Sequence, residues 1–206
     1  MLTGPIPYRS CRTAETVSFE RGRYARQAAG EYAGKFLYLP VDSMMRFVTL
    51  ATLLAISWVA MTFTHEVGHI IGGWLGGATL IRYDIAPWSL PFSLHNPDPI
   101  PVLTLWAGPI LGVVFPVGLA ALIRRPAAWF VADFCILANG TYLAAAWISG
   151  DQFLDTPRML DAGVPRVAIA LYCVLTIGGG YLRFRADCAA ILQSPSSNDP
   201  KTNSAE

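Results

Sequence analysis

Residues 47–69 read FVTLATLLAISWVAMTFTHEVGH, an apolar run that ends in two histidines and a glutamate. The part from Phe47 to Phe63 carries no charged residue and has about the length that crosses the hydrocarbon core of a bilayer. We expect the helix to continue to Leu75 and to end at Gly76 and Gly77, because glycine adopts the backbone conformation that closes a helix. The stretch therefore predicts a membrane-spanning helix with polar groups toward one end.

These polar groups, His65, Glu66 and His69, form an H-E-x-x-H motif. Residues i and i+4 share one face of a helix, so the two histidines can offer imidazole nitrogens to one Zn²⁺ ion. Glu66 can then reach a water molecule in an open coordination position, where a general base is needed. The alternative is two histidines that pack among helices without a metal. Inside a membrane span this is the weaker interpretation, because His and Glu in hydrocarbon are costly and usually mark function.

The composition favours one membrane-embedded unit. Hydrophobic residues make up 53% of the 206 residues and charged residues only 14%, against about a quarter in soluble proteins. A net charge of +1 without a basic stripe gives no case for nucleic acid. The cysteines lack paired spacing and are interpreted as packing residues rather than as disulfides or metal ligands: Cys11, Cys135, Cys173 and Cys188.

The rest of the chain predicts an all-α integral membrane protein with about four transmembrane helices. Three further apolar runs are long enough to span, at residues 102–123, 127–148 and 164–182. Two short β-prone pieces, 79–85 and 88–94, predict a hairpin-like loop at the membrane interface after the H-E-x-x-H helix. His95 in this loop is expected to be solvated. Asp133 in the third span is expected to pair with Arg124 or Arg125.

Three regions follow from this layout: a polar amino-terminal arm at 1–43, a membrane-embedded domain at 44–186 and a disordered polar tail at 187–206. Twelve of the fifteen Lys and Arg residues fall on one side of the four spans. Because cytoplasmic segments carry the excess of positive charge, both termini are expected in the cytoplasm, with the spans in the cell (inner) membrane.

The same layout puts the end of the first span and the loop at 149–165 on one side of the membrane. A catalytic zinc site needs a third protein ligand and an open position for water. This loop carries three carboxylates that could supply the ligand: Asp151, Asp155 and Asp161.

Four pieces of the chain, in this order, resemble the site-2 protease family of intramembrane zinc metalloproteases. The first three are the H-E-x-G-H helix at 65–69, Gly76-Gly77 before a hairpin-like loop, and Ala107-Gly108-Pro109 at the opening of a span. The fourth is Leu154-Asp155-Thr156-Pro157-Arg158-Met159-Leu160, which is similar to the family's L-D-G-G-R-(I/M)-L segment. The resemblance implies Asp155 as the third zinc ligand. From the loop itself, Asp151, one turn away, is the substitute, and Asp161 is expected to be a solvated carboxylate. The chain differs from the family at two places. Thr156 and Pro157 stand where the family has two glycines after the aspartate, and the spacing does not identify Asn139 with the asparagine that the family has near its A-G-P motif.

The function expected from the motif and the resemblance is intramembrane proteolysis. A water activated by zinc at His65, His69 and Asp155 would hydrolyse peptide bonds of membrane-protein substrates, with Glu66 as general base. One alternative is a catalytically inactive membrane scaffold or regulator that keeps this fold. A metal transporter is the other, and it is disfavoured because the second and fourth spans offer almost no polar residues for a pathway.

Overall fold

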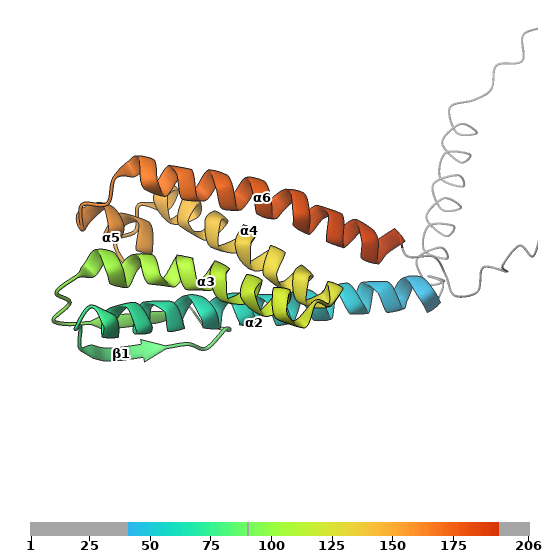
Figure 1. Cartoon of the computed structure of the whole chain (residues 1–206), viewed down its shortest axis with the longest axis horizontal. Coiled ribbons are helices and arrows are strands. Elements are labelled where there is room, and N and C mark those ends of the chain that lie inside the picture. The colour runs from blue at the N-terminus through green and yellow to red at the C-terminus, as the bar shows by residue number, and fades with distance from the viewer. Residues whose placement is uncertain (1–40, 90, 194–206) are drawn as a thin grey trace, which may run out of the picture. The chain divides into compact units, whose positions relative to one another are not determined.

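The computed structural model describes residues 41–89 and 91–193, in which five helices and a two-stranded sheet follow one another (Figure 1). The elements are α2 (Val41–Leu75), β1 (Leu80–Asp84), β2 (Phe92–His95), α3 (Pro101–Ile123), α4 (Pro126–Ser149), α5 (Asp155–Asp161) and α6 (Arg166–Gln193). The described residues from Met45 onward belong to one compact unit. The predicted arm lies outside the described residues, except for its last three, which belong to the start of α2.

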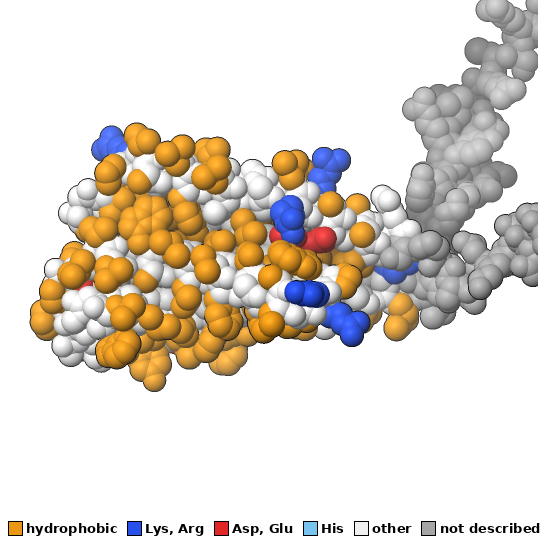
Figure 2. Space-filling view, viewed as in Figure 1, with side chains coloured by type: hydrophobic (Ala, Val, Ile, Leu, Met, Phe, Trp, Pro, Cys, Tyr) orange, Lys and Arg blue, Asp and Glu red, His pale blue; other side chains and the backbone are white. Residues whose placement is uncertain are grey.

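Four of the helices, α2, α3, α4 and α6, are long and apolar enough to cross a membrane, which confirms the predicted all-α membrane fold. Large hydrophobic side chains cover much of their outer surface, as Figure 2 shows. Phe47, Ile56, Phe115 and Leu175 are among the exposed ones. Such a surface is costly in water and is the ordinary outer surface of a bundle in lipid.

Helix α2 and helix α3 approach closely because glycines face each other. A Cβ atom on Gly68 would lie 2.4 Å from the Ala107 carbonyl oxygen and 2.8 Å from the Gly108 Cα. Any side chain there would force the two backbones apart. Gly77, at φ 77°, follows the end of α2 in the left-handed conformation, as the sequence predicted.

The hairpin-like loop is confirmed as two antiparallel strands, β1 and β2. Its connection is tied back to α2 by the Trp58 indole, which donates a hydrogen bond to the Pro87 carbonyl at 2.8 Å. Backbone hydrogen bonds between Thr79 and both Asn96 and Pro97 extend the pairing past the strands. The hairpin is therefore held beside the helix that carries the H-E-x-x-H motif.

Two helices differ from the sequence-based expectation. The polar loop at 149–165 contains the short helix α5, and Pro157 fits its first turn because the backbone N–H groups there have no helical acceptor. Helix α6 does not stop at Gly178–Gly180 but continues to Gln193, seven residues into the predicted tail. Gly180 packs against the Leu137 backbone of α4, which gives this glycine a role in helix packing. Residues 194–206 lie outside the described part.

The expectation for Asp133 is wrong in its partner. Asp133 is buried, at 1% exposed, and its Oδ1 accepts a hydrogen bond from Arg183 Nε at 2.7 Å, across the α4–α6 interface. Arg124 instead adopts the left-handed conformation that ends α3, and its side chain donates to the Ala121 carbonyl. A buried carboxylate requires a cationic partner, and the neighbouring helix supplies it.

Candidate metal centre

Three predicted side chains meet at one point inside the bundle. Asp155 Oδ2 lies 2.9 Å from His65 Nε2 and 3.1 Å from His69 Nε2, and the two Nε2 atoms lie 3.1 Å apart. All three residues are buried. Ligand atoms bound tetrahedrally to one zinc, with bonds of about 2.0 Å, lie about 3.3 Å from one another. The cluster has nearly these dimensions.

The outer nitrogen of each histidine is held by an oxygen acceptor. His65 Nδ1 lies 2.7 Å from Asn139 Oδ1, and His69 Nδ1 lies 2.8 Å from the Thr104 carbonyl oxygen. The Asn139 amide nitrogen donates to the Cys135 carbonyl at 2.8 Å, which fixes its Oδ1 as the acceptor toward His65. A neutral imidazole that donates from Nδ1 carries a lone pair on Nε2.

This hydrogen-bonding pattern tests whether the cluster fits a metal. With both Nδ1 atoms donating, two Nε2 lone pairs and one carboxylate oxygen converge within about one hydrogen-bond length of each other. Three acceptors at that separation repel unless a proton or a metal cation lies between them. Oriented imidazoles whose second nitrogen is held by a carbonyl or amide oxygen are typical of zinc ligands. The residues therefore fit a zinc ion.

Asp155 reaches the cluster because α5 begins there. Leu154 before it is extended, and the next residue, Thr156, is fully buried with its hydroxyl donating to the Leu143 carbonyl of α4 at 2.7 Å. Burial raises the pKa of the Asp155 carboxyl, but its close contacts with His69 and His65 outweigh burial, so this pKa lies below its usual range. Asp155 is thus a carboxylate at neutral pH, as a metal ligand must be.

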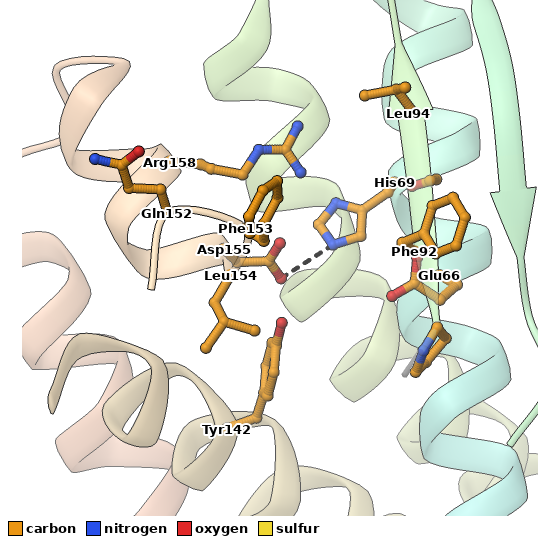
Figure 3. Close-up of a pocket in the computed structure, with 12 residues that line it drawn as sticks. Glu66, His69, Phe92, Leu94, Tyr142, Gln152, Phe153, Leu154, Asp155 and Arg158 are labelled. Carbon is orange, nitrogen blue, oxygen red and sulfur yellow. Dashed lines mark hydrogen bonds and ion pairs between the residues drawn. The ribbon is translucent and has the colours of Figure 1, made fainter. Parts of the chain in front are cut away.

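Glu66 and His69 open onto a cavity of about 430 Å³ (Figure 3). The cavity lies between strand β2, the end of α4 and helix α5, and its lining includes Ser93, Tyr142, Phe153 and Arg158. The Glu66 oxygen Oε2 is buried and has no hydrogen-bond partner among the described residues. An orphaned carboxylate oxygen next to the cluster is available to a water molecule or a substrate.

The other candidate residues lie elsewhere. Asp151 is exposed and accepts a hydrogen bond from the Phe153 backbone N–H at 3.0 Å, so it does not join the cluster. Asp161 is exposed, as expected. The expectation of a solvated His95 is wrong. It is 8% exposed on β2, and its ring occupies the space beside Gly73, where a Cβ atom would lie 2.6 Å from it. Burial lowers the pKa of His95, which favours its neutral form.

Sequence reasoning missed two groups that orient the histidines. The Thr104 acceptor is a backbone carbonyl, so no side-chain pattern could reveal it. Asn139 carried a signal, because an amide in the middle of an apolar span requires partners. Its partner lies 74 residues away along the chain, beyond the reach of spacing rules.

Comparison with known proteins identifies no relative. No family model, no curated protein and no solved structure matches this chain.

Proposed function

We propose that the chain is an intramembrane zinc metalloprotease that hydrolyses peptide bonds of membrane-protein substrates. The observation that carries the proposal is the convergence of His65 Nε2, His69 Nε2 and Asp155 Oδ2 within about 3 Å, in a cluster next to Glu66, whose Oε2 has no partner among the described residues. Three protein ligands leave one tetrahedral position open, which is the pattern of catalytic rather than structural zinc. The cavity supplies room for a peptide next to that position.

Each residue then has a defined part in the chemistry. A zinc ion held by His65, His69 and Asp155 would polarise water and a peptide carbonyl. Glu66 accepts the proton of the attacking water and returns it to the leaving amine, and its unpartnered Oε2 is free to do so. Asn139 and the Thr104 carbonyl keep the imidazoles in the tautomer that presents Nε2.

The proposal includes a location in the cell membrane with both termini in the cytoplasm. Its support is the charge count, because twelve of the fifteen Lys and Arg residues lie on the side of the termini. A substrate drawn from the bilayer has to be locally unwound, because the hydrogen bonds and side chains of a helix shield its peptide bonds.

The test is cleavage of single-span membrane proteins in proteoliposomes by the wild type and Glu66→Gln, each loaded with zinc. We expect cleavage by the wild type, a loss of at least about a hundredfold in Glu66→Gln, and equal zinc content in the two. Asp161→Asn removes an exposed carboxylate outside the cluster and is the matched control, expected to cleave normally. Full activity of Glu66→Gln would refute this mechanism. Zinc binding without any cleavage by the wild type would favour a membrane scaffold or regulator.

A further inference from the structure

Arg158 is a cation in the cavity that the proposed chemistry does not use. It lies one turn after Asp155 on helix α5, half-buried, and lines the cavity that also receives Glu66 and His69. Figure 3 shows its side chain extending from α5 past Phe153, with the guanidinium turned toward His69. Its guanidinium makes no hydrogen bond or ion pair with any residue in the described ranges. Five N–H donors are therefore left for a ligand.

The charges around the cavity are not balanced when a divalent cation is bound. The cavity lining contains two acidic residues, Asp155 and Glu66, so their carboxyl groups can offset at most the two charges of the metal. Arg158 then leaves at least one positive charge in excess, on a half-buried side chain of the lining. An unpaired charge that is partly removed from water is unfavourable, so a ligand that brings one negative charge is favoured.

We propose that Arg158 binds a carboxylate of the substrate close to the scissile bond, so that the enzyme prefers peptides with an acidic group at this place. The inference rests on the proposed function and names its substrate class. Guanidinium pairs with carboxylate through two parallel hydrogen bonds, which gives geometric selectivity as well as attraction. The carboxylate comes from an Asp or Glu side chain or from the free carboxyl terminus of a peptide.

The size of the cavity limits where this carboxylate lies. A sphere of the cavity's volume, about 430 Å³, is about 9 Å across, which is the span of two to three residues of extended peptide at about 3.3 Å each. Arg158 and His69 both line this space. A compact cavity would place the acidic group within about two residues of the bond that is cut.

The experiment uses three fluorescein-labelled peptide hydroxamates, whose hydroxamate occupies the metal in every case. The first has the sequence Leu-Leu-Asp with a carboxy-terminal amide, the second Leu-Leu-Asn with an amide, and the third Leu-Leu-Asn with a free carboxyl terminus. Fluorescence anisotropy measures their Kd for zinc-loaded wild type, Arg158→Gln, Arg158→Lys and Arg166→Gln. Arg166 is exposed and lies outside the cavity lining, so Arg166→Gln removes the same charge elsewhere.

We expect the wild type and Arg166→Gln to bind at least one carboxylate peptide about tenfold or more tightly than the neutral one. This ratio falls to about one in Arg158→Gln and is intermediate in Arg158→Lys, with zinc content unchanged. Preference for the first peptide assigns a side-chain carboxylate, and preference for the third a free terminus. Equal binding of all three by the wild type, or a preference that persists in Arg158→Gln, would overturn the inference and leave the metal centre standing. No binding of any hydroxamate by the wild type would overturn both.

Discussion

At the scale of single residues, the orientation of two imidazole rings decides what the cluster can bind. His65 and His69 present their Nε2 atoms to Asp155 only because their Nδ1 atoms have acceptors, Asn139 Oδ1 and the Thr104 carbonyl. Without its acceptor, His65 could rotate or change tautomer, and a buried N–H would be left unpaired.

Asn139→Ala is therefore expected to weaken zinc affinity by about 10- to 100-fold while the protein stays folded. Competition with a zinc chelator measures the affinity. The control is Thr141→Ala on the same helix, because the exposed Thr141 hydroxyl bonds only to its own helix, at the Leu137 carbonyl. Unchanged affinity in Asn139→Ala would show that the amide does not orient the ligand.

The sequence predicted His65, His69 and Glu66 from helical spacing alone, and the resemblance selected Asp155 from three loop carboxylates. It could not predict Asn139 or Thr104, whose contacts with the histidines arise from the packing of α3 and α4 on α2. The burial of His95 was equally hidden, since the space it fills exists only where Gly73 faces the folded hairpin.

At the scale of elements, the site depends on how closely α3 approaches α2. A Cβ atom on Gly108 would meet the imidazole of His69, at 2.3 Å from its Nε2 atom. The ligand would have to move, or α3 would have to withdraw. Gly118 on the same helix faces open space, because a Cβ atom there would have no neighbouring atom within 4 Å.

Gly108→Ala is expected to weaken zinc binding by at least about tenfold, because a displaced ligand atom no longer fits tetrahedral geometry. Gly118→Ala is expected to bind zinc normally and to be slightly more stable, since alanine favours the helix over glycine by about 1 kcal/mol in water. Zinc titration and thermal unfolding measure both variants. Normal zinc affinity in Gly108→Ala would mean that the close approach does not shape the site.

The elements themselves were largely predictable from hydrophobic runs and turn residues. Helix α3 starts at Pro101, and proline is favoured at the first position of a helix. Helix α2 ends just before Gly76, and glycine is favoured just after the end of a helix. Helix α5 was not expected, because its seven residues are largely polar, include a proline and show no helical periodicity. The burial of Thr156 and Met159, which only the folded bundle provides, stabilises this helix. The continuation of α6 was missed because a run of three glycines usually ends a helix, whereas here Gly180 packs on α4.

At the scale of the whole molecule, an ion pair between two helices adds to the apolar packing that joins the bundle. Asp133 on α4 and Arg183 on α6 form it, and the Arg183 guanidinium also lies 5.1 Å from the centre of the Trp129 ring. Asp133 is six residues before Asn139, about 9 Å further along the helix from the His65, His69 and Asp155 cluster. The pair therefore contributes to assembly of the bundle and does not touch the site.

Arg183→Gln is expected to destabilise the protein by about 1–3 kcal/mol, because it leaves the buried Asp133 carboxylate without its cationic partner. The expected loss is smaller than for a fully buried ion pair, because the Arg183 side chain is 54% exposed. The double variant with Asp133→Asn should recover much of the loss. Thermal unfolding in detergent measures stability, and zinc content should not change. A double variant as unstable as the sum of the two single ones would contradict direct pairing.

The central claim is that His65, His69 and Asp155 hold one zinc ion. Zinc content per chain of the detergent-purified protein tests it directly, with Asp155→Ala as the variant and Asp151→Ala as the control from the same loop. We predict about one zinc per chain in the wild type and in Asp151→Ala, and a loss in Asp155→Ala. A wild type that holds no zinc even after reconstitution, or an Asp155→Ala that holds as much as the wild type, would contradict the account.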